Sequence, residues 1–301
     1  MNIIISGAFG HIGSFLINKF KNDKKIKNIL LIDNFLTQRY SSYLKLNKKK
    51  FELVDKDVRD VDFKKIKKKY DIFIHLAAIT NAAESFQIRN KLKRNNFGAT
   101  KKIVNYCKIK NIKLIFPSST SVYGKKFEII NSSNNMKNLF AQSPYAESKI
   151  LEEKYIRKKL KKYTILRLGT IVGVSDGIRF HTAVNKFCYQ ASLKKPLTLW
   201  KKFYKKKRPY LTLKDCFKTI NLVIKKNIFF GETLDVVTNN YTVEDIVKMI
   251  EKKIQIKKKF VNTEILNQNS YEVISDKLIE LGIHLKSNIS DEIKKTLKIL
   301  S

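Results

Sequence analysis

Three features of the sequence predict an α/β fold with a doubly wound parallel sheet. Short apolar runs alternate with amphipathic segments through the first half of the chain, a glycine-rich turn follows the first run, and an aspartate ends the second. Strands of a parallel sheet are buried on both faces and therefore consist of short apolar runs. The segments between them supply helices that cover the sheet, and ligands bind at the carboxyl ends of the strands.

The apolar runs and the helical patterns alternate in order along the chain. The predicted strands are residues 2–6, 29–33, 51–56, 72–76, 113–117 and 164–168. The predicted helices are residues 11–21, 62–69, 87–110 and 145–161. Further along, a helix over 211–227 and a strand over 233–237 are expected to return to the same sheet.

The glycine-rich turn is the strongest local signal. Gly7, Gly10 and Gly13 follow the first strand and open the first helix, which is the context that a dinucleotide site requires. Gly7 allows the tight turn, Gly10 lets backbone N–H groups approach a pyrophosphate, and Gly13 lets helix and strand pack closely. His11 and Ile12 then lie at the helix N-terminus that faces the anion. The pattern predicts a Rossmann-type sheet.

The segments outside this sheet predict a smaller mixed α/β lobe. Residues 173–207 read as helical with irregular ends, a capped helix is expected over 242–253, and short helices are expected in the tail from Asp276, around Gly282. We therefore assign residues 1–169, completed by about 211–237, to a dinucleotide-binding domain. Residues 170–210 and 238–301 are assigned to a substrate-binding lobe.

Asp33 ends the second predicted strand, 20 residues beyond Gly13. A carboxylate at this place accepts hydrogen bonds from the adenosine ribose and repels a 2′-phosphate. The position therefore favours NAD over NADP. Asn34 is counted with the cofactor-binding residues, and Arg39 forms no obvious phosphate clamp with it.

The composition is that of a globular chain. Apolar residues make up 43% of the 301, which excludes wholesale disorder, and no run reaches the ~20 apolar residues that span a bilayer. The N-terminus has neither a basic leader nor an Ala-x-Ala-like site, so export is not expected. Cys107, Cys188 and Cys216 are odd in number and widely spaced, which predicts a reducing, cytoplasmic location with neither a disulfide framework nor a metal site.

The net charge of +36 comes from lysine, which supplies 54 of the 62 basic residues. A strongly basic chain is typical of proteins that bind nucleic acid or anionic surfaces. The lysines are spread over the whole chain, however, and phosphate recognition usually relies on Arg. We interpret the excess as compositional, with a polyanion-binding role left as the alternative. The positive field still attracts anionic substrates.

Several short motifs follow the glycine-rich turn in a fixed order. They are Asp57-Val58-Arg59-Asp60, His75-Leu76-Ala77-Ala78, Asn95-Asn96-Phe97-Gly98-Ala99 and Tyr145-Ala146-Glu147-Ser148-Lys149. In this order the sequence resembles the extended short-chain dehydrogenase/reductase family, in its nucleotide-sugar epimerase and dehydratase branch, along nearly the whole chain. The resemblance implies that Asp57 and the Val58 backbone hold adenine, and that Leu76, Ala77, Ala78 and Asn95 contact the cofactor. It also implies a homodimer paired through residues 87–110 and 145–161.

The Tyr145-x-x-x-Lys149 pair gains its meaning from context. The chain holds four such pairs, about what 13 Tyr and 54 Lys give by chance. At Tyr145 a proline precedes the tyrosine at a predicted helix start, and a hydroxyl-rich turn follows the fifth strand upstream. The i, i+4 spacing puts both side chains on one helix face, where an ammonium favours the phenolate. Tyr145 can then act as general base and acid, while both residues also contact the cofactor.

The turn after the fifth strand indicates which reaction the pair serves. The resemblance implies that Ser119 shares the reacting oxygen with Tyr145, that Ser118 lines the nicotinamide pocket, and that Thr120 contacts substrate. Dehydratases of the family carry an Asp-Glu pair after this serine, and decarboxylating members carry a Glu in the same loop. This chain has Thr120-Ser121 instead. What remains is oxidation at C4 and return of hydride to the other face, the chemistry of a 4-epimerase similar to UDP-glucose 4-epimerase.

Further residues predicted to bind the nucleotide sugar lie in the second half of the chain. Arg208 begins Arg-Pro-Tyr-Leu-Thr-Leu-Lys-Asp215, which resembles the family element whose arginine grips a diphosphate. Arg179 and Asn185 fall where relatives contact phosphates. Thr170 replaces the usual asparagine of the preceding element. These departures leave the sugar and the base undetermined.

Two alternatives remain open. One is another enzyme of the branch, an NAD-dependent nucleotide-sugar dehydratase, reductase or dehydrogenase. The other is a non-catalytic Rossmann module that senses cofactor or binds nucleic acid through its lysines. Such a module would have no need of Ser119, Tyr145 and Lys149 together.

Overall fold

The computed structural model describes residues 1–124, 129–131, 139–262 and 270–300. A seven-stranded sheet in the order β11-β7-β5-β4-β1-β2-β3 forms its centre, and every strand pair in it is parallel. Its strands are β1 (Asn2–Ser6), β2 (Asn28–Asp33), β3 (Phe51–Asp55), β4 (Ile72–His75), β5 (Lys113–Ser119), β7 (Tyr163–Leu168) and β11 (Glu232–Val236). The predicted doubly wound sheet is confirmed, and its order reverses between β1 and β4, where such folds place their ligand.

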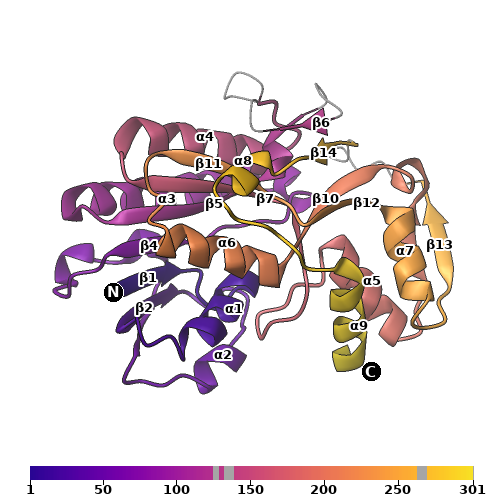
Figure 1. Cartoon of the computed structure of the whole chain (residues 1–301), viewed down its shortest axis with the longest axis horizontal. Coiled ribbons are helices and arrows are strands. Elements are labelled where there is room, and N and C mark those ends of the chain that lie inside the picture. Colours follow the sequence, from indigo (N-terminus) through magenta and orange to yellow (C-terminus); the bar gives the residue numbers. More distant parts are fainter. Residues whose placement is uncertain (125–128, 132–138, 263–269, 301) are drawn as a thin grey trace.

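Helices cover both faces of this sheet (Figure 1). They are α1 (His11–Phe20), α3 (Arg89–Lys110), α4 (Pro144–Lys159) and α6 (Leu213–Lys225). Side chains alternate between the two faces along a strand. Accordingly Ile3 and Ile5 of β1 pack in one cluster with α1 and α6, while Ile4 packs in another with α3 and α4. Both clusters are apolar, as the strand composition predicts.

The predicted helix over 62–69 was wrong. Only a 3-10 turn forms there, at Phe63–Lys65, capped by Asp62, whose side chain accepts from the N–H of Lys64. Five lysines in this segment repel one another and leave no continuous apolar stripe, so a longer helix has little to bury. Phe63 turns into the core, and Ile66 is partly buried against the same cluster.

The reading of 173–207 as helical was only partly right. Helix α5 occupies Ala183–Ser192, but β9 (Leu197–Trp200) and the start of β10 (Lys207–Thr212) follow it. Leu197 and Leu199 are fully buried and alternate with half-buried residues, which is a strand pattern that the flanking lysines obscured. Because β10 continues to Thr212, α6 begins at Leu213 rather than Leu211.

The remaining elements build smaller sheets beside the large one (Figure 1). Strand β10 lies between β8 (Thr170–Val172) and β12 (Asn239–Thr242), β9 pairs with β13 (Lys258–Val261), and β6 (Ile129–Ile130) pairs with β14 (Glu272–Val273). The other helices are α2 (Ser41–Leu44), α7 (Val243–Glu251), α8 (Asp276–Glu280) and α9 (Ile289–Leu300). α5, α7 and α9 share an apolar cluster with β9 and β10. The predicted cap of α7 is confirmed, since Thr242 and Asp245 form a capping box.

Within the residues that the structure describes, no helix has both the length and the apolar character needed to cross a membrane.

Candidate active site

The glycine-rich turn lies between the end of β1 and the start of α1. Gly7 adopts φ +67°, and a Cβ there would stand 2.6 Å from the backbone nitrogen of Ala77. A Cβ at Gly13 would stand 2.4 Å from the carbonyl oxygen of Ala8. Both positions therefore exclude any side chain, one for conformational and steric reasons and the other for close packing. This is the cradle that a dinucleotide needs at the N-terminus of α1.

Residues 173–177 lie directly against this turn, which the sequence did not indicate. A Cβ at Gly177 would stand 2.5 Å from the carbonyl oxygen of Phe9. Ser175 Oγ donates to the carbonyl oxygen of His11 at 2.8 Å. His11 Nε2 lies 2.9 Å from the carbonyl oxygen of Gly173, so this nitrogen carries the proton. Burial lowers the pKa of His11 to about 3, so His11 is neutral at physiological pH.

Asp33 faces the same turn from the end of β2. Its carboxylate accepts from the backbone N–H of Phe9 and from that of Phe35, each at 2.9 Å. Burial raises the pKa of Asp33, and these two hydrogen bonds oppose the shift. Arg39 lies near this carboxylate, since the Arg39 guanidinium interacts electrostatically with Asp33. Asp33 thus orders both the glycine turn and the loop after β2, and is positioned to meet a ribose hydroxyl.

The predicted adenine site joins the ends of β2 and β3. Asp57 accepts from both Nε and Nη2 of Arg59 at 2.8 Å, and Asn34 Nδ2 lies 3.3 Å from its Oδ2. The Arg59 hydrogen bonds are the main reason why the pKa of Asp57 is lowered. The carboxylate is therefore already engaged, while Val58 beside it is buried.

The strand-four motif borders the turn on its other side. Ala77 contacts Gly7, and Leu76 donates its N–H to the carbonyl oxygen of Ser6 at 2.9 Å. Ala78 follows as a half-buried residue. The loop is held by Asn96, which accepts from the N–H of Ile79 at 2.9 Å and donates to its carbonyl oxygen at 3.0 Å. The predicted Asn95 instead donates to Asn96, at 3.1 Å. Asn96, which the motif match did not single out, is the residue that holds this loop.

The predicted catalytic residues lie on two elements in contact, Ser119 at the end of β5 and its 3-10 turn, and Tyr145 and Lys149 on α4. α4 starts with Pro144 after the N-cap Ser143, whose hydroxyl accepts from the N–H of Ala146 at 3.2 Å, and this fixes Tyr145 in the first turn. α4 packs against the 3-10 turn that follows Ser119. Ser119 is half-buried at the end of β5, whereas Ser118 is buried and donates to Glu153 at 2.6 Å.

Lys149 lies one turn further along α4. Its Nζ lies 3.2 Å from Oε2 of Glu152, and the two side chains are 4% and 1% exposed. The ammonium also lies 4.4 Å from the centroid of the Phe116 ring. The sequence did not single out Glu152, because a charge on a lysine-rich helix reads as solvated.

The turn after β5 also reaches toward β10. Thr120 Oγ1 lies 3.3 Å from the hydroxyl of Tyr271, and the guanidinium of Arg208 lies 5.7 Å from the ring of Tyr271. Thr170 pairs with Tyr210, two residues beyond Arg208 on the neighbouring strand. Thr120 and Arg208 are therefore linked through Tyr271, which the sequence did not indicate, and Thr170 joins them through strand pairing with β10.

Arg179 and Asn185 follow residues 173–177, which lie against the glycine turn, and Asn185 is in α5. Arg179 Nη1 donates to the hydroxyl of Thr80. Burial lowers the pKa of this guanidinium, and its interaction with Tyr145 opposes that shift. Asn185 is fully buried, accepting from the N–H of Gly173 at 3.3 Å and donating to the carbonyl oxygen of Arg179 at 3.1 Å. Arg179 thus faces the tyrosine, and Asn185 holds the segment that carries it.

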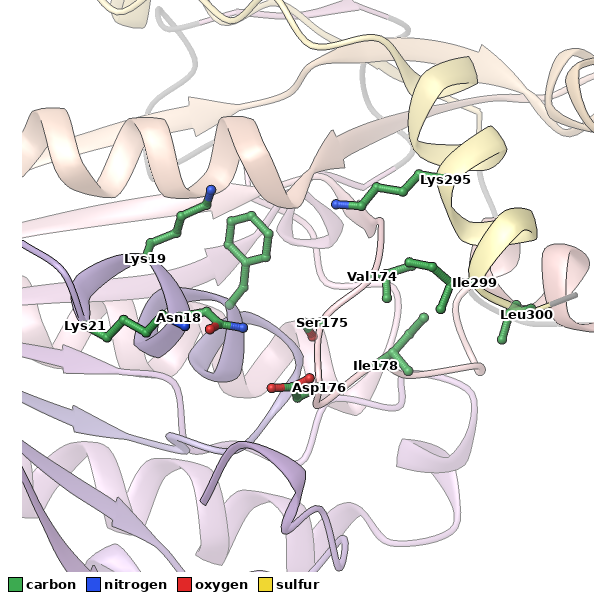
Figure 2. A pocket seen from close by; sticks show the side chains of 11 residues that line it. Asn18, Lys19, Lys21, Val174, Ser175, Asp176, Ile178, Lys295, Ile299 and Leu300 are labelled. Atoms are coloured by element: carbon green, nitrogen blue, oxygen red, sulfur yellow. The ribbon is translucent and has the colours of Figure 1, made fainter. Parts of the chain in front are cut away.

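A surface groove of about 550 Å³ lies elsewhere, between α1 and α9 (Figure 2). Its lining includes Phe15, Lys19 and Lys295, and none of the predicted site residues. The groove is therefore separate from the candidate active site. Among the described residues, no group of three or more His, Cys, Asp and Glu side chains is arranged to hold a metal ion.

Comparison with known proteins decides the family. The model of the NAD dependent epimerase/dehydratase family matches residues 3–236. The chain belongs to this family. This epimerase/dehydratase is thus an enzyme with NAD as its cofactor, and the non-catalytic alternative falls away.

Individual relatives agree with the family. The chain is 28% identical over 250 residues to the uncharacterized UDP-glucose epimerase YtcB of Bacillus subtilis (strain 168), covering 78% of this chain and 76% of that protein. The UDP-glucuronic acid 4-epimerase of Bacillus cereus, solved with UDP-glucuronic acid and NAD, superposes with a TM-score of 0.86 at 24% identity, over 100% of this chain and 99% of that one. The UDP-N-acetylglucosamine 4-epimerase of Methanobrevibacter ruminantium M1 superposes with a TM-score of 0.87 at 22% identity, over 99% and 97%.

The geometry of this epimerase/dehydratase fits NAD. The turn at Gly7 and Gly13 has no room for side chains, which lets a pyrophosphate approach the backbone at the N-terminus of α1. Asp33 lies at the end of the next strand, held by backbone N–H groups. These are the two features that a dinucleotide site in this fold requires.

Proposed function

We propose that the protein is a nucleotide-sugar 4-epimerase, similar to UDP-glucose 4-epimerase, that acts through a transient 4-keto sugar. The observation that carries the proposal is the meeting of α4 with the end of β5. The helix that carries Tyr145 and the buried Lys149 ammonium contacts the turn that follows Ser119, which supports the proposal. A base, a hydroxyl and a cation at the carboxyl edge of the sheet suit oxidation of an alcohol.

Tyr145 is the group that takes the proton from the C4 hydroxyl and returns it to the same oxygen when hydride comes back to the opposite face of C4. The Lys149 ammonium favours the phenolate form that the base requires. Ser119 shares the substrate oxygen and aligns the proton between the two hydroxyl groups. NAD, when bound, accepts hydride from C4 and gives it back, so no net redox change results.

The substrate proposed is a UDP-sugar. The relatives with this fold act on UDP-glucose, UDP-glucuronic acid or UDP-N-acetylglucosamine, as their names state. Arg179 and Arg208 both follow the turn after β5 in sequence and offer guanidinium groups to a diphosphate. Thr120 and Thr170 would contact the sugar or the nucleotide nearby. The high positive charge of the chain favours an anionic substrate.

Incubation of the purified protein with UDP-, GDP-, CDP- and dTDP-sugars tests the proposal. The expected product is the C4 epimer of one UDP-sugar, formed without added NAD and without NADH release. Water loss from the sugar would identify a dehydratase. Consumption of added NAD would identify a dehydrogenase, and a requirement for added NADH with a keto sugar would identify a reductase.

The proposal extends to assembly and location. α3 and α4 pack against each other on one face of the sheet, and we assign this face to the contact of a homodimer. Equilibrium sedimentation tests it, and a monomer at assay concentrations would refute it. The thiols of Cys107, Cys188 and Cys216 are all free and buried, which supports a reducing, cytoplasmic location. Fractionation of the source cells tests that location.

The division of labour along the chain is also part of the proposal. Residues 1–169 with 211–237 bind NAD, and residues 170–210 with 238–301 bind the nucleotide sugar. The separate apolar cluster around α5, α7 and α9 supports this division. Protection from hydrogen exchange by NAD should concentrate in the first set, and added protection by the UDP-sugar in the second.

A further inference from the structure

The ammonium of Lys149 is paired with a carboxylate on its own helix, in a place nearly closed to water. Nζ lies 3.2 Å from Oε2 of Glu152, and the side chains are 4% and 1% exposed. The ring of Phe116, 4.4 Å away, shields the ammonium on another side. A cation this deeply buried loses its proton readily unless a counterion lies beside it.

Glu152 is itself held from three elements. Ser148 donates to its Oε1 at 2.6 Å, and Thr100 of α3 donates to its Oε2 at 3.3 Å. Because Thr100 donates to the carboxylate, its oxygen accepts from His75 Nε2 of β4, 3.2 Å away. His75 Nδ1 then accepts from Ser6 Oγ of β1 at 2.8 Å. The hydrogen bonds all point toward the carboxylate, so its position is fixed.

The other charged groups near this pair do not replace Glu152. Burial lowers the pKa of His75 to about 3, with Lys149 lowering it further, so this imidazole on β4 carries no charge at physiological pH. Glu153 on α4 is bound to Arg167 of β7 at 2.6 Å. Arg179, from the segment over the glycine turn, faces Tyr145 and adds positive charge. Glu152 is the anion that the described structure pairs with Lys149.

We propose that Glu152 is a positioning residue, which keeps the buried Lys149 ammonium charged and in place so that it can favour the phenolate of Tyr145. The catalytic role of Glu152 rests on the proposed function. The effect of Glu152 on the ionisation of Lys149 and Tyr145 does not. Loss of the Glu152 charge lets Lys149 shed its proton. The phenolate then loses its electrostatic support and forms only at higher pH.

The phenolate absorbance of Tyr145 tests this directly. The pH titration of each protein is compared with the same protein carrying Tyr145→Phe, and the difference isolates this phenol from the other tyrosines. Glu152→Gln, which preserves shape and removes charge, is expected to raise the midpoint by about one pH unit, a tenfold change. An unchanged midpoint would leave Glu152 without this role. A lower midpoint would also overturn the proposal, since Lys149 would then remain charged without its partner.

Thr100→Val is the matched control. It removes a hydrogen bond from the same buried network and keeps both charges. The midpoint should stay at the wild-type value. A rise as large as that of Glu152→Gln would show that packing of the network, and not the charge, sets the ionisation, which contradicts the proposal.

A second measurement, thermal unfolding as a function of pH, tests the proposal if the Glu152→Gln protein folds poorly. It is made in the Tyr145→Phe background, so that the shifted titration of the phenol does not oppose the effect of Lys149. There, Glu152→Gln lets the folded state release a proton that the unfolded state retains, so stability should rise with pH relative to the Tyr145→Phe protein. The deficit in Tm at pH 7 is therefore expected to shrink toward pH 10. A deficit that does not change with pH would overturn the proposal.

Neither measurement uses substrate, so the two proposals fail separately. If the wild-type protein epimerises no nucleotide sugar but the midpoint moves as predicted, the proposed function fails and the role of Glu152 in Tyr145 ionisation stands. If the protein epimerises and the midpoint does not move, only the role of Glu152 fails.

Discussion

The carbonyl oxygen of Phe9 lies 2.5 Å from the point that a Cβ on Gly177 would occupy. Gly177 therefore closes the segment 173–177 onto the glycine-rich turn from outside the large sheet. The contact is reinforced by the N–H of Gly177, which donates to Ser14 Oγ at 2.9 Å. A cofactor site that the sequence places in the first 13 residues thus depends on a residue more than half the chain away.

Gly177→Ala should weaken NAD binding. The new methyl group must push the backbone at Phe9 and Gly10, and overpacking of this kind costs ~1–3 kcal/mol, so the Kd for NAD should rise about tenfold. Calorimetric titration with NAD measures it. Gly98→Ala is the control, because a Cβ there would meet only the Arg59 side chain at 3.5 Å. Equal affinity in wild type and Gly177→Ala would contradict the prediction.

Tyr145→Phe should lower kcat by at least ~100-fold while NAD stays bound, because the proton acceptor is removed and the fold is kept. Product formation and the cofactor content of the purified protein measure the two effects. Tyr155→Phe alters another Tyr-x-x-x-Lys pair on α4, where the hydroxyl contacts only Asn105 at 3.3 Å among the partners that the structure describes. That variant should retain activity. Full turnover by Tyr145→Phe would remove the phenol from the mechanism.

Asp33→Ala should weaken NAD far more than NADP. The carboxylate is preformed by the N–H groups of Phe9 and Phe35, and it would repel the 2′-phosphate of NADP. We expect a loss of about tenfold or more for NAD, measured by titration with both dinucleotides. Asp55→Ala removes the aspartate in register with it at the end of β3 and should leave both affinities unchanged. An equal loss of both cofactors in Asp33→Ala would refute the assignment.

Arg208→Lys should raise KM for the nucleotide sugar with a smaller effect on kcat. A lysine replaces a planar guanidinium that can hold a diphosphate with two hydrogen bonds, and the expected rise is about tenfold. Initial rates over a range of substrate concentrations separate the two constants. Arg94→Lys, on the exposed surface of α3, is the matched control. An unchanged KM in Arg208→Lys would mean that the diphosphate binds elsewhere.

Asp235 predicts a pH dependence of stability. Burial raises its pKa to about 7, against the opposing effects of Arg167 and of the hydrogen bond from Tyr123. The folded state therefore holds a proton that the unfolded state has released between about pH 4 and pH 7, and the stability from this group is lost as pH rises through 7.

Asp235→Asn should remove this contribution. Its Tm should fall less than that of wild type between pH 5 and pH 8, by roughly 2–5 °C, as measured by thermal unfolding. Asp55→Asn, at an exposed strand end, should show the wild-type slope. Parallel curves for wild type and Asp235→Asn would contradict the prediction.

The large sheet was predicted well because the residues of each strand themselves show whether that strand is buried. A strand buried on both faces must be apolar throughout, so the six strands of the first half and β11 were found within a few residues of their ends. The cap of α7 depends on two residues three positions apart, and it was found for the same reason. The errors at 62–69 and 197–200 arose where lysines hide the apolar period that distinguishes helix from strand.

The sequence by itself determined the doubly wound sheet, the glycine turn and the order of the family motifs, because each is encoded by neighbours in the chain. Only the tertiary structure decided which side chains and backbone groups come into contact. It placed Gly177 on Phe9, joined Thr120 to Tyr271, and paired Lys149 with Glu152 out of water. The physical reason is that burial and distance set the strength of a contact or a charge, and both arise only when segments far apart in the sequence pack together.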